Sequence, residues 1–249
     1  MKQIAPECPL CSKLTSESGN NAECDLYHQD KRRSYYQCAR CMLVFVPACY
    51  HLCAVDEKAE YDKHQNNPDD PGYQRFLSRV TFPLFERVKL KEKESCSETI
   101  SIIDCGSEAG VGSTKIRGLD FGCGPGPAIS VMAEREHLRV DNYDLYYFSE
   151  PGLLQKQYDF ITMTEVIEHL ASPMMVLKQL DAMLKPEAIL AIMTKRVTDQ
   201  KAFSGWHYKN DPTHICYYSE ATFAWIGQEL GWRLEIIDKD VVFFHQQAD

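Results

Sequence analysis

The most constraining feature of the chain is a glycine-rich turn after a short apolar stretch. Residues 119–128 read LDFGCGPGPA, and glycine at 122, 124 and 126 lets the backbone pass close to a ligand, since any Cβ there would collide with it. The following residues have room for a helix of about ten residues and then for a strand over 140–145. A strand, a glycine turn, a helix and a second strand together predict an α/β unit with parallel strands.

A second stretch, IIDCGSEAGVG at 102–112, has a similar pattern but a different continuation. Only the six residues STKIRG separate it from the next predicted strand. A crossover connection between parallel strands needs a dozen residues or more. We therefore interpret 119–128 as the ligand-binding turn, and 102–112 as an insertion or an extra edge segment before the core.

The second predicted strand ends in Asp144, 22 residues after Gly122. A carboxylate at the end of the second strand of such a unit can reach ribose hydroxyls. The glycine spacing is GxGxG, and Pro127 takes the position of the third glycine of a dinucleotide motif. A proline at the first helical position lacks the N–H that could hold a pyrophosphate. The pattern favours an uncharged nucleoside conjugate over NAD.

The remainder of the chain alternates between strands and helices. Ser172 and Pro173 are predicted to start one helix, and Ser219 and Gly231 to begin and end another. Strands are predicted at YDFITM (158–163), AILAIM (188–193), RLEII (233–237) and VVFFH (241–245). Only three residues join the last two strands, so these should be antiparallel. We expect an α/β, doubly wound, mostly parallel sheet closed by an antiparallel hairpin.

Taken together, these motifs resemble class I S-adenosylmethionine-dependent methyltransferases. The similarity rests on LDFGCGPG, on Asp144 within NYDLYY, on YDFITMTEVIEHL and on the closing hairpin, and it covers 118–249. It is strongest to the group with an EVIEH motif, which includes ubiquinone-biosynthesis-type enzymes. The resemblance implies a Rossmann-like methyltransferase sheet with an antiparallel last strand, S-adenosylmethionine as cofactor, and methyl transfer as the activity.

The resemblance also implies cofactor-binding residues. Asp120, Gly122, Cys123, Gly124 and Gly126 would line the methionine moiety, Asp144 would bind the ribose diol, and Thr164 and Glu165 would lie beside the cofactor. The segment from Asp144 to Tyr158 is short, so the third strand of the family fold is expected to be rudimentary. In relatives, the segment that carries Tyr61, His64 and Tyr73 here often folds over the cofactor.

Candidate catalytic residues lie in two places. Glu168 and His169 follow the predicted strand 158–163, at the sheet edge where ligands of open α/β folds bind. His207 and His214 lie in GWHYKNDPTHICYYS (205–219), an aromatic stretch that could form a substrate lid. Each is a candidate general base. The alternative is structural: the first pair caps its loop, and the second stretch is the packed start of the next helix.

The chain has eleven cysteines, and four of them form two CxxC pairs: Cys8 with Cys11, and Cys38 with Cys41. Two such turns can close a tetrahedral Zn²⁺ site, which predicts a small N-terminal zinc ribbon. Cys24 and the Cys49-x-His51-x-Cys53 stretch are alternative ligands. We divide the chain into a zinc-ribbon-like module at 1–53, a helical connector with an insertion at 54–117, and a methyltransferase domain at 118–249. In the connector, 73–90 has helical spacing interrupted by Pro83, and 91–99 should be an exposed linker.

Charge and apolar runs restrict the partners. The net charge of −9 and a pI near 5.4 argue against non-specific binding to nucleic acid. The start of the sequence lacks a signal-peptide pattern, and no apolar run is long enough to span a bilayer, so we expect a cytoplasmic protein without membrane association. A small-molecule acceptor is favoured. The alternatives are an RNA methyltransferase whose ribbon holds nucleic acid through Lys31-Arg32-Arg33 and Arg40, and a catalytically silent binding module.

Overall fold

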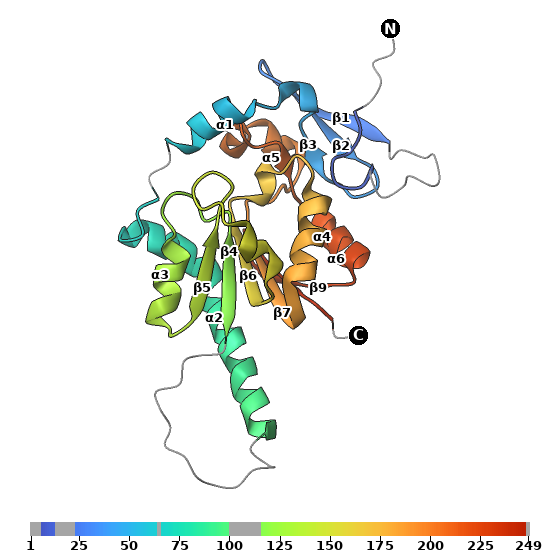
Figure 1. Ribbon diagram of the computed structural model, residues 1–249. Helices are drawn as coiled ribbons and strands as arrows, with labels where there is room; N and C mark the ends of the chain where they lie inside the picture. Colours follow the sequence, from blue (N-terminus) through green and yellow to red (C-terminus); the bar gives the residue numbers. More distant parts are fainter. Residues whose placement is uncertain (1–5, 13–22, 64–65, 100–115, 248–249) are drawn as a thin grey trace, which may run out of the picture.

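The computed structural model describes residues 6–12, 23–63, 66–99 and 116–247, which form two β-sheets with helices around them (Figure 1). The stretch 102–112, predicted to be an insertion or edge segment, and His64 lie outside the described residues.

The larger sheet has six strands in the order β5-β4-β6-β7-β10-β9. Strands β5, β4, β6 and β7 are parallel, and β10 is antiparallel to both β7 and β9. The predicted doubly wound sheet with an antiparallel last strand is therefore confirmed. The bounds are β4 (Arg117–Phe121), β5 (Arg139–Tyr143), β6 (Tyr158–Thr164), β7 (Leu184–Met193), β9 (Arg233–Asp238) and β10 (Val241–His245).

The third strand of the family fold is reduced, as expected. Residues 144–157 are all described, and they hold an isolated bridge between Asp144 and Phe148 and the short helix η3 (Pro151–Gln155), but no strand. The polypeptide returns directly from β5 to β6 and leaves β5 at the edge of the sheet.

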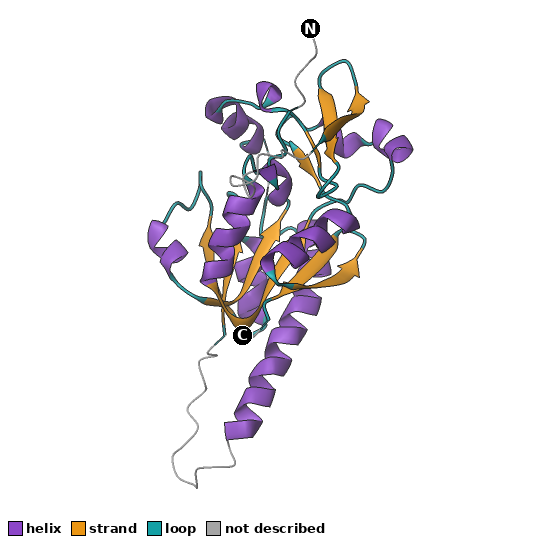
Figure 2. Ribbon diagram, turned by 90° about the vertical axis from the view of Figure 1, so that its right-hand side faces the viewer, coloured by secondary structure: helices purple, strands orange, loops and turns teal. Residues whose placement is uncertain are grey.

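Helices cover both faces of this sheet, as Figure 2 shows. One face packs against α2 (Pro71–Thr99) and α3 (Ala128–Arg135), and the other against α4 (Pro173–Met183) and α6 (Glu220–Leu230). Side chains of β10 alternate between them: Val241 and Phe243 belong to the first core, Val242 and Phe244 to the second. This period of two is expected of a strand that is buried on both faces.

The helix ends show where local signals suffice. The Ser219 side chain accepts a hydrogen bond from the Thr222 N–H, and Gly231 ends α6 at φ +69°, as predicted. Pro127 is the N-cap of α3, one position before the predicted site. The expected linker at 91–99 is wrong, because α2 continues through Pro83 to Thr99. Its Lys- and Glu-rich composition favours a helix, since straight-chain residues have high helix propensity.

The smaller sheet combines distant parts of the chain. Its order is β1 (Cys24–Gln29), β2 (Ser34–Cys38), β3 (Val44–Phe45) and β8 (Cys216–Tyr217). Strand β8 belongs to the 205–219 stretch, so this segment completes a sheet that the N-terminal residues begin. The short helices η2 (Ala48–Tyr50), α1 (Ala54–Tyr61), α5 (Gln200–Ser204) and η5 (His207–Asn210) complete the described structure around it. The division at residues 53 and 117 stays a prediction.

Candidate active site

The glycine-rich turn lies at the carboxyl ends of the parallel strands. Gly122 and Gly124 have φ values of +78° and +63°, a region that non-glycine residues rarely adopt. A Cβ on Gly122 would lie 2.4 Å from a methyl carbon of Val166, which follows β6. Two of the three glycines are therefore needed for the backbone conformation of the turn.

Asp144 braces this turn from the end of β5. Its Oδ2 accepts a hydrogen bond from the Gly124 N–H at 3.0 Å, and its Oδ1 accepts from the N–H groups of Tyr146 and Tyr147 at 2.8 and 3.1 Å. A carboxylate has about four lone-pair sites, so one acceptor position is left after these three bonds. The predicted ribose contact would use that position.

Asp120, the second-last residue of β4, is almost fully buried. The Thr162 hydroxyl donates to its Oδ1 at 2.8 Å. The pKa of Asp120 is raised to about 7, mainly by burial; the nearby Asp144 charge adds to the shift and the Thr162 hydrogen bond opposes it. The Asp120 carboxyl, at the bottom of the site, therefore changes its charge near neutral pH.

The segment before the sheet lies against the glycine turn. A Cβ on Gly126 would lie 1.5 Å from the carbonyl oxygen of Asn66. Burial raises the pKa of Tyr73, and its acidic neighbours Asp120, Cys123 and Glu165 add to the shift, so the ring lies within electrostatic range of the predicted cofactor residues. The structure thus brings Tyr73 to the site, as the resemblance implied, and adds Asn66, for which the sequence carried no signal.

Helix α1 approaches the site from the same side. The Tyr61 ring lies 5.8 Å from that of Tyr146 and 5.3 Å from that of His169, measured between centroids. The Tyr146 hydroxyl donates to Glu57 in α1 at 2.7 Å. Helix α1 therefore connects the residues after β5 to those after β6.

Thr164 ends β6, and Glu165 follows it with φ +52°. Glu165 Oε2 accepts a hydrogen bond from the Tyr208 hydroxyl at 3.1 Å, and Glu168 Oε1 accepts from the same hydroxyl. Burial raises the pKa of Glu165 to about 8 and that of Glu168 to about 7, and the two carboxyls also repel each other's charge. The Tyr208 hydroxyl has one proton and can donate it to only one carboxylate at a time. The arrangement of Glu165 and Glu168 is therefore most stable when one of the two carboxyls is protonated.

Three of the four predicted catalytic residues come together. The donor atoms of Glu168, His169 and His214 all lie within 4.8 Å of one another. His207 does not join them: its Nε2 lies 3.1 Å from the Lys195 Nζ in an exposed position. Tyr208 was in the predicted aromatic stretch but not among the predicted site residues, since only the fold identifies which of its aromatics reaches the carboxyls.

The N-terminal sheet holds the 205–219 stretch in place. Arg33, 7% exposed, donates to the carbonyls of Lys209 and Asp211 at 2.7 and 2.8 Å and to the Tyr217 hydroxyl at 2.8 Å. The Lys209 Nζ lies 3.0 Å from Asp30 Oδ2. Arg33 is thus an interior residue. It is not part of the exposed basic patch that was an observation in favour of the RNA alternative.

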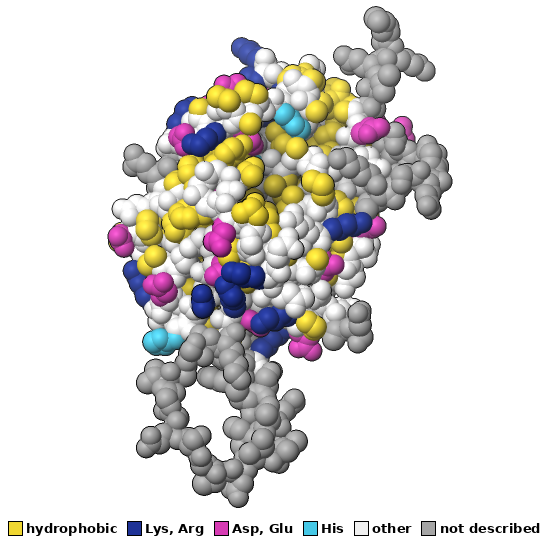
Figure 3. Space-filling model, in the orientation of Figure 1, with side chains coloured by type: hydrophobic (Ala, Val, Ile, Leu, Met, Phe, Trp, Pro, Cys, Tyr) yellow, Lys and Arg dark blue, Asp and Glu magenta, His cyan; other side chains and the backbone are white. Residues whose placement is uncertain are grey.

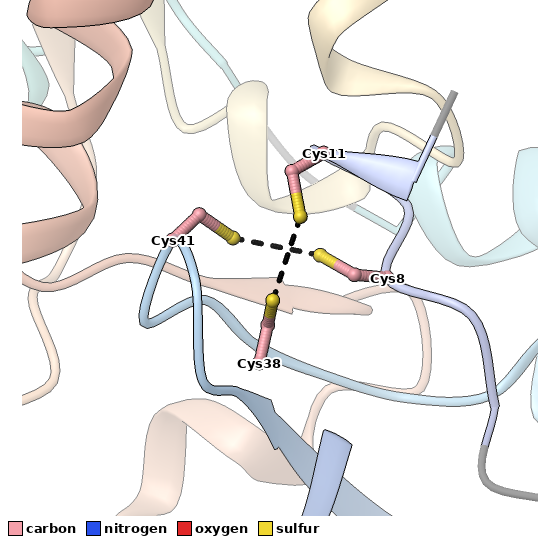
Figure 4. Close-up of side chains that lie close together, drawn as sticks. All are labelled: Cys8, Cys11, Cys38 and Cys41. Carbon is pink, nitrogen blue, oxygen red and sulfur yellow. Dashed lines mark hydrogen bonds between the residues drawn. The ribbon is translucent and has the colours of Figure 1, made fainter. Parts of the chain in front are cut away.

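The four CxxC cysteines are buried and point toward one another (Figure 4). The sulfur atoms of Cys8 and Cys41 are 3.5 Å apart, as are those of Cys11 and Cys38. The alternative ligands lie elsewhere: Cys49 and Cys53 are exposed, and His51 Nε2 lies 2.9 Å from the Val46 carbonyl. Cys24 pairs across the strands with Cys38 but is not in the four-sulfur group.

The surface of the molecule is mixed in charge. On the face in Figure 3, hydrophobic side chains gather over the upper half, where α1 and the N-terminal sheet lie, and Lys and Arg side chains lie among Asp and Glu lower down. Within the described ranges, none of the helices has the length and apolarity that a bilayer span requires.

No match was found among curated proteins. An O-methyltransferase family protein from Burkholderia thailandensis aligns with a TM-score of 0.43 at 12% identity, over 70% of this chain and 57% of its own length. The plantazolicin methyltransferase BpumL with SAH aligns with a TM-score of 0.43 at 15% identity, over 78% and 90%. A SAM-dependent methyltransferase from Archaeoglobus fulgidus aligns with a TM-score of 0.41 at 18% identity, over 66% and 76%.

The sequence model of the family described as "Methyltransferase domain" matches residues 73–236. This range contains the glycine turn, Asp144, the EVIEH motif and the whole 205–219 stretch, and it also includes the connector from Tyr73 onward. The chain therefore belongs to the methyltransferase-domain family.

Proposed function

We propose that the chain is an S-adenosylmethionine-dependent methyltransferase that acts on a small molecule. The observation that carries this proposal is the braced glycine turn at the carboxyl edge of the sheet, with Asp120, Asp144 and Glu165 around it. A sulfonium cofactor is positively charged at sulfur. A buried site built from carboxylates complements such a cation, whereas it would repel the pyrophosphate of a dinucleotide.

The predicted cofactor-binding residues are compatible with S-adenosylmethionine. Gly122, Gly124 and Gly126 present a side-chain-free backbone, and Asp144 keeps one acceptor position for a ribose hydroxyl. When bound, S-adenosylmethionine would supply an electrophilic methyl group for an in-line displacement. The residues of the chain then mainly orient the acceptor and take its proton where needed.

The acceptor side of the proposed site is the group formed by Glu165, Tyr208, Glu168 and His169. Two carboxyls whose pKa values are raised to about 8 and about 7 exchange protons near neutral pH. A general base works best when its pKa is near the working pH. Within this group we assign proton removal from the acceptor to Glu165, and not to the exposed His207.

The charge distribution supports a small acceptor over RNA. Arg33 is directed into the 205–219 stretch, and Arg32 donates to the carbonyl oxygen of Asn210. Arg33 is buried, and the exposed Arg32 is hydrogen-bonded to Asn210 at the surface, so both guanidinium groups already have partners within the chain. Together with the net charge of −9, this favours an acceptor that enters the site without its own polyanionic backbone.

We further propose that Cys8, Cys11, Cys38 and Cys41 bind a structural Zn²⁺. Zinc–sulfur bonds of about 2.3 Å in a tetrahedron separate the sulfurs by about 3.8 Å, and two of the sulfur pairs are 3.5 Å apart. The ion would stabilise the small sheet, which in turn positions the 205–219 stretch through Arg33 and β8. The ion would therefore stabilise the acceptor side of the proposed site without taking part in the reaction.

The first experiment measures cofactor binding by calorimetry on the full-length chain. S-adenosylmethionine and S-adenosylhomocysteine should both bind, and Asp144→Ala should weaken binding at least about tenfold, because the turn loses the charged acceptor of its N–H groups. Asp25→Ala, an exposed residue of β1, is the matched control and should bind normally. Absence of binding by the unchanged chain would refute the cofactor assignment.

The second experiment identifies the acceptor class. The purified chain is incubated with methyl-labelled S-adenosylmethionine and separately with metabolite, RNA and protein fractions. Label should enter the metabolite fraction and depend on Glu168. Label in RNA, or only in protein, would overturn the small-molecule acceptor while leaving the methyltransferase assignment intact.

A further inference from the structure

A second group of metal-ligand side chains lies beside the proposed acceptor site. Glu168 and His169 belong to the short helix η4 (Ile167–His169), and His214 belongs to the 205–219 stretch. Their donor atoms lie within 4.8 Å of one another, and the imidazole centroids of His169 and His214 are 4.8 Å apart. The fold therefore brings two imidazoles and a carboxylate together from segments 45 residues apart.

The hydrogen bonds of both imidazoles select one tautomer. His169 Nδ1 lies 3.1 Å from the Thr213 carbonyl oxygen, and His214 Nδ1 lies 2.7 Å from the Tyr208 carbonyl oxygen. A carbonyl oxygen only accepts, so each Nδ1 carries a proton, and in the neutral imidazole each Nε2 then carries the lone pair. Histidines that bind metals through Nε2 commonly donate Nδ1–H to a carbonyl in this way.

The carboxylate supplies an independent observation. Glu168 is fully buried, its Oε1 is held by the Tyr208 hydroxyl, and its Oε2 has no hydrogen-bond partner. A buried carboxylate oxygen without a donor is costly, and such groups call for an ion or another ligand.

We propose that Glu168, His169 and His214 bind one divalent transition-metal ion, separate from the zinc of the four-cysteine group. Two nitrogens and one oxygen suit ions such as Mn²⁺, Fe²⁺ or Zn²⁺ and leave coordination positions open. Two ligands of one ion lie at most about 4.2 Å apart when each bond is about 2.1 Å. The three side chains would close by several tenths of an ångström on binding.

The open positions define the acceptor class. An ion here would lie beside Glu165 and Tyr208, next to the predicted methyl donor, and would bind an acceptor through oxygen. A hydroxyl bound to the ion would lose its proton more readily than in water, with Glu165 as the proton acceptor. Its oxygen would then form a bond to the methyl carbon as the methyl–sulfur bond breaks, and S-adenosylhomocysteine would leave. The acceptor is thus a hydroxyl compound that coordinates the ion, and this second step rests on the proposed methyl transfer.

The test uses Mn²⁺ alone, with the full-length chain and no methyl donor, and follows the spectrum of the free ion by electron paramagnetic resonance. Mn²⁺ is chosen because it favours carboxylate and imidazole ligands over the thiolates of the four-cysteine group. One Mn²⁺ per chain should bind to the unchanged protein and to His207→Ala, the exposed histidine of the same stretch. Binding should weaken at least about 100-fold in Glu168→Gln and His214→Ala, since loss of a ligand exceeds the 10- to 100-fold effect of an outer-shell partner.

A third variant guards against misfolding. His169→Asn removes a half-buried ligand and should lose Mn²⁺ while keeping the circular dichroism and the S-adenosylmethionine affinity of the unchanged chain. No Mn²⁺ binding by the unchanged chain, or equal binding by it and the ligand variants, would overturn the metal site. Because no methyl donor is present, these outcomes are distinguishable from a failure of the proposed function, which the calorimetric titration reports.

Discussion

The glycine turn and the 205–219 stretch form the two sides of one candidate site, but they are built differently. The turn is held by neighbours in the βαβ unit: Asp144, the next strand end, accepts the Gly124 N–H. The 205–219 stretch is held by residues nearly 180 positions away, Asp30 and Arg33, and by pairing of β8 with β3. The proposed cofactor side is therefore held by residues close in sequence, whereas the proposed acceptor side depends on the N-terminal sheet.

The largest effect on the 205–219 stretch should follow from loss of the proposed zinc ion of the four-cysteine group. Cys38→Ser should lose zinc and unfold the small sheet, because a structural zinc site contributes about 10–16 kcal/mol in small modules. Hydrogen exchange measured by mass spectrometry should rise over 205–219 and stay low over 119–128. Cys53→Ser, an exposed cysteine outside the group, is the control. If protection of 205–219 survives zinc loss, the dependence of the acceptor side on the N-terminal sheet is wrong.

A smaller effect should follow from changing one arginine. Arg33→Gln should lower the free energy of unfolding by about 3–5 kcal/mol, because several buried acceptors of the 205–219 stretch lose their donor. Arg32→Gln, which changes the exposed neighbour, should stay within about 0.5 kcal/mol of the unchanged chain. Urea unfolding measures both. Equal effects of the two substitutions would contradict the interior role of Arg33.

The cofactor side should show its own signature in pH dependence. Burial raises the pKa of Asp120 from 3.8 to about 7, so the folded state keeps a proton that the unfolded state has lost. The associated stability is fully present below about pH 4 and is lost as the pH rises through 7. Between pH 5 and 8, the free energy of unfolding should fall by about 2–3 kcal/mol more in the unchanged chain than in Asp120→Asn.

Denaturant unfolding at the two pH values, without methyl donor, measures this difference. Asp25→Asn, an exposed aspartate, is the control and should follow the unchanged chain. Parallel pH profiles for the unchanged chain and Asp120→Asn would show that Asp120 ionises normally in the fold.

Much of the larger sheet followed from local patterns. The part of β7 that is buried on both faces, residues 188–193, is apolar throughout, and a helix such as α6 carries its own start and end signals at Ser219 and Gly231. The errors arose where local signals compete: Pro83 and the charged residues after it suggested an interruption and a linker, but α2 continues. Packing of α2 against β6 and β7 outweighs one missing hydrogen bond.

The order of strands and helices over 118–249 and the grouping of the four CxxC cysteines could be predicted from the sequence, because both depend on residue type at short spacing. The choice of 119–128 over 102–112 as the ligand-binding turn stays a prediction, since 102–112 lies outside the described residues. Only the tertiary structure decided that Glu168, His169 and His214 converge while His207 stays apart, and that Tyr208 joins Glu165 to Glu168. It also decided that Arg33 is an interior residue. Such contacts join segments 40 to 180 residues apart, and their distances depend on how the two sheets pack, which no local spacing encodes.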